Sequence, residues 1–132
     1  MVAIVAGAAE RDNAAAIINT SKARIADLTS SGIDLHLLKC VVAVSRLLVT
    51  TDSGPRHYGV ALGVPTVCLM GPTHPGYSTG TQPNDRVLRV EVDCGPCQLR
   101  ACPRDHRCMA DVTPEMAARA CMEALSLGRE GT

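Results

Sequence analysis

Short apolar runs separated by amphipathic stretches follow one another along the chain. The first run, Val2–Ala6, is rich in β-branched residues and ends at Gly7, which is typical of a strand buried on both faces of a parallel sheet. Later runs lie between turn residues and predict further strands. The predicted strands are Val2–Ala6, Ala26–Leu28, Leu47–Thr50, Pro65–Met70 and Val87–Val92.

The stretches between these runs carry helical signals. Ser31 with Asp34 three residues later fits a capping box that opens a helix through Val44. Pro55 favours the first turn of a helix, and Gly63 its end. Helices are predicted from Glu10 to about Ile18, up to Val44, from Pro55 to about Gly63, and from Pro114 onward. Strands alternating with helices predict an α/β fold built on a doubly wound parallel sheet.

Ligands of such sheets bind beyond the carboxyl ends of the strands, where loops lead into helices. The loop Thr50–His57 joins a predicted strand directly to a helix. Gly54 allows a ligand to approach the backbone, and the helix N-terminus favours a phosphate-like anion. Ser53, Arg56 and His57 add possible donors. The alternative is that Asp52 or Ser53 only caps the helix and His57 packs against the sheet.

Two further strand ends carry polar residues. Gly71–Thr73 follows the strand Pro65–Met70, so its backbone and the Thr73 hydroxyl are predicted to face the same crevice as the first loop. Glu10 follows the first strand, where an acidic side chain accepts hydrogen bonds from ribose hydroxyls. An ordinary turn and a solvated Glu in a first helical turn remain the alternatives.

Composition limits the remaining choices. The 132 residues hold 13 basic and 13 acidic side chains, so net charge offers no footprint for nucleic acid or an anionic membrane. The absence of Phe and Trp leaves the core to aliphatic residues. The longest apolar stretch, around Leu35–Val44, contains His36 and Lys39, which argues against a transmembrane segment. A cytoplasmic location is the expectation, with the inner face of the membrane as the alternative.

Four of the seven cysteines form the pattern C-x2-C-x4-C-x5-C. Four thiolates within a short loop can hold Zn²⁺ or an iron–sulfur cluster, although the later spacings match no standard zinc signature. Disulfide or redox-sensitive pairing and plain packed thiols stay open as alternatives. No cofactor is expected otherwise, and a bound metal would staple the loop rather than catalyse. The four residues are Cys94, Cys97, Cys102 and Cys108.

The stretch Thr51–His57, continued by Ala61–Pro65 and Gly71–Pro75, closely resembles glycosyltransferase family 9, the ADP-heptose:lipopolysaccharide heptosyltransferase family. The segments Cys94–Cys97 and Cys102–Met109 resemble a cysteine-bearing subgroup of it. The resemblance implies a GT-B enzyme with two Rossmann-like domains. Residues 1–132 would form most of the C-terminal, donor-binding domain, lacking its first strand–helix unit and the N-terminal acceptor domain.

The resemblance also implies roles for individual residues. Asp52, Ser53, Gly54 and His57 would lie at the diphosphate and sugar of a nucleotide-sugar donor such as ADP-heptose, with Thr73 nearby. Glu10 would approach the ribose, and the backbone at Gly32 and Ile33 the adenine. Such enzymes invert the anomeric centre without a metal, and the general base belongs to the absent domain. That domain would also bind the lipid-linked or saccharide acceptor. A metal or redox module and an inactive relic are the other functions considered.

Overall fold

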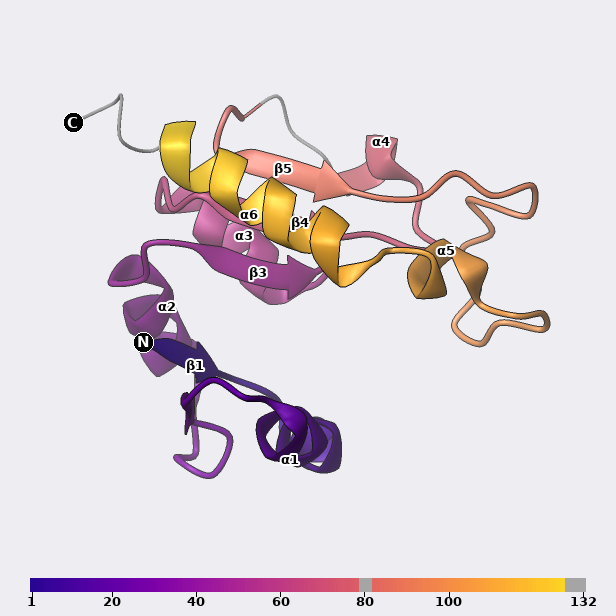
Figure 1. Cartoon of the computed structure of the whole chain (residues 1–132). Coiled ribbons are helices and arrows are strands. Elements are labelled where there is room, and N and C mark those ends of the chain that lie inside the picture. Colours follow the sequence, from indigo (N-terminus) through magenta and orange to yellow (C-terminus); the bar gives the residue numbers. More distant parts are fainter. Residues whose placement is uncertain (79–81, 128–132) are drawn as a thin grey trace. The chain divides into compact units, whose positions relative to one another are not determined.

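The computed structural model describes residues 1–78 and 82–127, in which helices and strands alternate (Figure 1). The chain divides into two compact units, Met1–Cys40 and Val41–Thr132. The sequence predicts a loop that starts at Gly71 and runs to about Asp85, and residues 79–81 of it lie outside the described residues. Residues 128–132, at the end of the predicted domain, also lie outside them.

The first unit is built around two parallel strands, β1 (Val2–Ile4) and β2 (Ile25–Asp27), with Val2 opposite Ile25. A 3₁₀ turn, η1 (Ala8–Glu10), leads into α1 (Arg11–Thr20) between them. Strand β1 is two residues shorter than the predicted Val2–Ala6, because its pairing with β2 ends at Ile4, and β2 begins one residue earlier than the predicted Ala26–Leu28.

The helix after β2, α2, spans Leu35–Ala43 and begins later than the predicted capping box requires. The Leu37 amide donates to Asp34 Oδ1 at 2.7 Å, so Asp34 itself caps the helix. The predicted box with Ser31 as the cap is therefore wrong by three positions. An aspartate next to an apolar helix start satisfies an otherwise unpaired amide as well as a serine does, which explains the shift.

The second unit contains a three-stranded parallel sheet of order β3-β4-β5. Leu48 lies opposite Thr66, and Thr66 opposite Asp85. Because all three strands run in one direction, the loops that follow them meet at one edge of the sheet. The elements are β3 (Leu48–Thr51), α3 (Gly54–Ala61), β4 (Thr66–Leu69), α4 (Pro75–Ser78), β5 (Asp85–Leu88), α5 (Arg107–Ala110) and α6 (Pro114–Leu127).

Strand β5 begins at Asp85 and ends at Leu88, which differs from the predicted Val87–Val92. Hydrogen bonds from the Thr66 amide to the Asn84 carbonyl and from the Met70 amide to the Leu88 carbonyl hold this register. A prediction based on hydrophobicity misses the start of the strand because its first residue is an aspartate whose side chain is 2% exposed.

Side chains of β4 alternate between two helical layers. Val67 is fully buried and packs with Ala120 and Ala124 of α6. Thr66 points the other way, toward Gly59 of α3. In Figure 1, α6 accordingly lies in front of this sheet and α3 behind it. Helices on both faces of a parallel sheet confirm the predicted Rossmann-like α/β class.

The five strands described nevertheless form two separate hydrogen-bonded sheets, one of two strands and one of three. Within residues 1–78 and 82–127, β1 and β2 pair with each other, and neither pairs with β3, β4 or β5. The same part of the chain contains no helix long and apolar enough to cross a bilayer.

Gly59 sets how closely α3 approaches the sheet. A Cβ built there would overlap Thr66 Oγ1 and come within 2.8 Å of Leu48 Cδ2. We therefore expect Gly59→Ala to lower the free energy of unfolding by about 1–3 kcal/mol through overpacking, measured by urea denaturation. Gly54→Ala, in the same helix, places its Cβ in open space and is the matched control. Equal stability of the two variants would contradict this packing argument.

Candidate functional site

The loop between β3 and α3 leaves the start of α3 open. Ser53 is the N-cap residue, yet its side chain makes no capping hydrogen bond. Its hydroxyl instead donates to the Thr51 carbonyl at 3.3 Å and lies 3.4 Å from Thr50 Oγ1. Gly54 is exposed, and nothing lies within 4 Å of a Cβ built on it. The positive end of the helix dipole thus faces unobstructed space, as an anion site requires.

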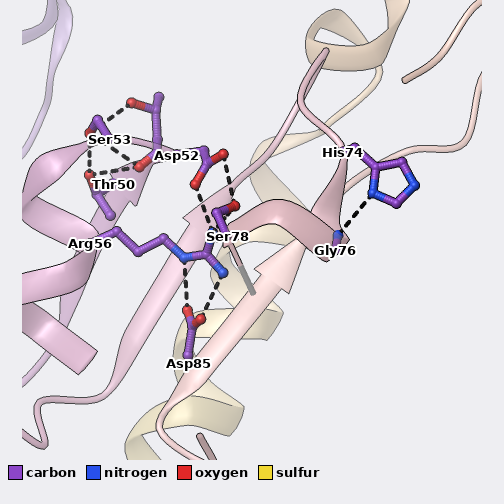
Figure 2. A network of polar contacts seen from close by, with 9 residues as sticks. Thr50, Asp52, Ser53, Arg56, His74, Gly76, Ser78 and Asp85 are labelled. Carbon is purple, nitrogen blue, oxygen red and sulfur yellow. Dashed lines mark hydrogen bonds and ion pairs between the residues drawn. The ribbon is translucent and has the colours of Figure 1, made fainter. Parts of the chain in front are cut away.

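Asp52 does not cap α3 either, because its carboxylate is engaged elsewhere. Arg56 Nη1 donates to Asp52 Oδ1 at 2.7 Å, and Ser78 Oγ donates to Asp52 Oδ2 at 3.0 Å (Figure 2). Ser78 Oγ also accepts a hydrogen bond from Arg56 Nη1 at 3.0 Å. These three side chains close a ring of hydrogen bonds between the β3–α3 loop and α4. The structure therefore contradicts the alternative that the side chain of Asp52 or Ser53 serves only as a helix cap.

Arg56 continues the network to β5. Its Nε and Nη2 donate to the two oxygens of Asp85 at 3.1 and 2.7 Å, forming a bidentate fork. The arginine is fully buried, and Figure 2 shows its guanidinium lying between the two carboxylates. The sequence predicts Arg56 as a further donor to the anion, which is wrong because its guanidinium is buried and occupied by carboxylates. It assigns Asp85 no role. The spacing of Asp52 and Arg56, four residues apart across a helix start, was the available signal.

The network controls the ionisation of Asp52. Burial pushes the pKa of Asp52 upward, but hydrogen bonds from Arg56, Ser78 and Thr73 outweigh it and hold that pKa below its usual value. For Arg56, burial acts to lower the pKa, and the hydrogen bonds to Asp85 and Asp52 reverse this and raise it. Asp52 is thus a stable anion at neutral pH and a weak base.

The second predicted loop, Gly71–Thr73, does meet the first. Thr73 lies close enough to Asp52 to help lower the pKa of that carboxyl, which brings the two predicted site residues near each other. Behind this loop, a Cβ on Gly71 would come within 2.6 Å of Met109 Sδ in α5, and the Gln98 amide donates to the Pro72 carbonyl at 2.9 Å. The cysteine-bearing segment therefore supports the second loop from behind.

His57 lies on the exposed side of α3. The alternative of a histidine packed against the sheet does not fit this exposure. No hydrogen bond joins its imidazole to the Ser53 hydroxyl among the interactions of the described residues, so a serine nucleophile activated by this histidine is absent there.

The three other predicted donor residues lie in the first unit. Glu10 Oε2 accepts a hydrogen bond from the Gly7 amide at 3.1 Å, which satisfies the backbone before η1. Gly32 has a φ of +61°, a left-handed conformation that glycine adopts without strain, and Ile33 is half-buried. Glu10 follows β1 and Gly32 follows β2, so all three lie beyond the carboxyl edge of this two-stranded sheet.

The four patterned cysteines line one cavity of about 80 Å³ together with Pro72, His106 and Arg107. All four are free thiols, and burial together with the charges of the other three raises the pKa of Cys108. Arg104 and Arg107, which flank this cluster, form ion pairs with Asp93. Over residues 1–78 and 82–127 no group of three or more His, Cys, Asp or Glu side chains is placed to hold a metal ion.

Strand-to-helix loops that meet at the carboxyl edge of a parallel sheet, with helices on both faces of that sheet, define the class of Rossmann-like α/β proteins. A model of glycosyltransferase family 9 (heptosyltransferase) matches residues 1–107. The chain therefore belongs to glycosyltransferase family 9.

Individual relatives agree with this membership. Lipooligosaccharide heptosyltransferase 2 of Campylobacter jejuni is 37% identical over 79 residues, covering 56% of this chain and 24% of that protein. Lipopolysaccharide heptosyltransferase 1 of Pseudomonas aeruginosa is 41% identical over 63 residues, covering 47% and 18%. The chain thus matches about a quarter or less of the length of these curated relatives.

Solved structures show the same fold. A family 9 glycosyltransferase from Veillonella parvula superimposes with a TM-score of 0.80 at 22% identity, covering 94% of this chain and 36% of that one. The ADP-heptose LPS heptosyltransferase II of Escherichia coli gives a TM-score of 0.79 at 24% identity, covering 99% and 38%.

The buried network gives a stability prediction. Arg56→Met leaves Asp52 and Asp85 without their counter-ion, so we expect the free energy of unfolding to fall by about 3–5 kcal/mol in chemical denaturation. Arg86→Met removes the exposed ion pair with Glu123 and is the matched control, expected to cost about 1 kcal/mol or less. Similar losses for both variants would show that Arg56 is not a buried ion-pair centre.

The lowered pKa of Asp52 gives a pH prediction. The stabilisation from this carboxylate is complete above its unfolded pKa of about 3.9 and disappears as the pH falls through the still lower folded value. We expect Asp52→Asn to be less stable than wild type at pH 6 and the gap to narrow below about pH 4. Urea denaturation at a series of pH values measures it, and a gap independent of pH would refute the assignment.

Proposed function

We propose that this chain forms the nucleotide-sugar-binding part of a heptosyltransferase. Its ligand is a nucleoside diphosphate sugar such as ADP-heptose, and the proposed reaction is inverting transfer of the sugar to a lipopolysaccharide-core acceptor. The observation that carries the proposal is the open start of α3 at Gly54, next to Asp52 and Thr73, in a chain of glycosyltransferase family 9. The names of the relatives support the choice of a heptose donor.

The open helix start suits the chemistry of the leaving group. In inverting transfer, an acceptor hydroxyl attacks the anomeric carbon, the carbon–oxygen bond to the diphosphate breaks, and negative charge grows on the departing diphosphate. The Gly54 N–H and the positive end of the α3 dipole stabilise that charge without reorganising. They act alone in this turn, because Pro55 has no N–H and the Arg56 amide donates to the Ser53 carbonyl. The exposed His57 imidazole, one turn into α3, adds a donor on the same helix.

Asp52 does not take the proton of the acceptor hydroxyl in this proposal. Both of its oxygens accept hydrogen bonds within the network, and its lowered pKa makes it a poor general base at neutral pH. We propose that the base and the acceptor site belong to a separate N-terminal domain in the GT-B arrangement. There the acceptor is a lipid-linked saccharide, and the enzyme acts in the cytoplasm or at the inner face of the membrane.

The remaining donor contacts are proposed by position. To accept hydrogen bonds from the ribose hydroxyls, the Glu10 carboxylate would either give up its hydrogen bond from the Gly7 amide or accept both. The backbone at Gly32 and Ile33 would contact the base. No metal is proposed for the transfer step, since fixed dipoles and donors meet the charge of the diphosphate.

Binding of ADP by the 132-residue chain tests the proposal. We expect an NMR titration to shift the amide signals of Gly54, His57 and Thr73, and AMP to bind less tightly because it carries less charge at the helix start. A folded chain whose spectrum does not change with ADP would rule the proposal out.

Gly54→Ala sharpens the same test. The added methyl group occupies the open space over the helix start, so we expect the Kd for ADP to rise about tenfold while the melting temperature stays within a few degrees of wild type. The Kd for adenosine, which has no phosphate, is the internal control and should not change. An unaltered ADP affinity would place the diphosphate away from α3.

A further inference from the structure

Arg56 connects three parts of the second unit that are far apart in the sequence. Its guanidinium bonds to Asp52 after β3, to Ser78 at the end of α4 and to Asp85 at the start of β5. The last two partners lie 22 and 29 residues away from it. Since Arg56 is fully buried, it cannot contact a ligand bound at the surface, and any effect on binding must act through these partners.

The geometry divides the guanidinium into two functional edges. The Nε–Nη2 edge is filled by the fork to Asp85, whose side chain is 2% exposed. The remaining nitrogen, Nη1, donates to Asp52 and to Ser78, and Ser78 in turn donates to the second oxygen of Asp52. Asp85 thus orients the arginine, and the arginine with Ser78 orients Asp52.

Charge gives this arrangement a consequence for an anionic ligand. Asp52 immediately precedes the N-cap of α3 and is 13% exposed, so it lies beside the helix start proposed for the diphosphate. An unpaired carboxylate there would repel phosphate strongly, because interactions between charges are poorly screened where side chains are buried. The ion pair with Arg56 reduces that repulsion, although Arg56 also pairs with Asp85 and the cluster of three side chains keeps one net negative charge.

We propose that Arg56 is a positioning residue of the donor site, which neutralises Asp52 and holds the β3–α3 loop against α4 and β5 so that α3 accepts a diphosphate. This inference rests on the proposed function, in that it presumes that the diphosphate binds at α3. It assigns a role in ligand binding to a side chain that never meets the ligand.

The experiment compares the Kd values of ADP, AMP and adenosine for wild type, Arg56→Met, Arg56→Lys and the double variant Asp52→Asn/Arg56→Met, with Arg86→Met as the control. All are titrated as the full chain by NMR. We expect Arg56→Met to weaken ADP binding at least about tenfold, AMP less, and adenosine less than about twofold. Arg56→Lys keeps a charge without the fork and should fall between.

The double variant separates charge from architecture. It lacks the guanidinium and also the Asp52 carboxylate beside the helix start, but the Asp85 carboxylate stays without its partner. We therefore expect a partial recovery, with ADP affinity at least about threefold higher than that of Arg56→Met. A merely structural role would instead weaken adenosine and ADP equally in Arg56→Met, and the double variant would not recover. That result would overturn the inference.

Ser78→Ala keeps the test decisive if Arg56→Met does not fold. It removes one bond to Asp52 and one acceptor for Arg56, and we expect a smaller loss that again affects ADP and spares adenosine. Folded Ser78→Ala and Arg56→Lys variants that bind ADP as wild type does would also overturn the inference. Failure of wild type to bind ADP would instead contradict the proposed function itself.

Discussion

The site depends on one buried cation between two carboxylates. Arg56 would be costly to bury alone, since a desolvated charge without partners is strongly unfavourable. Asp85 and Asp52 compensate for it from two sides, and each is itself desolvated by the contact. Because none of the three is tolerated without the others, their relative positions are fixed, and with them the path of the chain into α3.

The spacing of apolar residues along the sequence, together with the turn residues between them, was enough to predict the class of fold. The apolar run Pro65–Met70 contains β4, and Pro55 and Gly63 lie within two residues of the ends of α3. The limits of β5 could not be predicted the same way, because its first position carries a buried aspartate satisfied by an arginine 29 residues away. Hydropathy records the polarity of a residue and has no access to a distant partner.

The candidate site, like the fold, could be predicted from the sequence only in part. Thr73 was expected beside the first loop, and its effect on the pKa of Asp52 agrees with that, because carboxyl ends of parallel strands meet at one edge. The role of Asp52 was harder to foresee, since a side chain that faces a ligand and one that holds a loop have the same sequence signature. Only the coordinates reveal that both its oxygens are occupied. The contacts of Glu10, Gly32 and Ile33 with a nucleotide stay predictions.

The sequence separation within the Arg56 network also bears on the order of folding. Helix α3 is complete at Ala61, but the fork to Asp85 forms only when β5 has joined β4. During synthesis from the N-terminus, the guanidinium therefore stays hydrated until the third strand of this sheet has emerged and paired. The loop before α3 would then reach its final conformation only when β5 pairs with β4, in the last step of sheet assembly. A chain stalled before β5 would contain α3 but would lack a fixed conformation for the loop that leads into it.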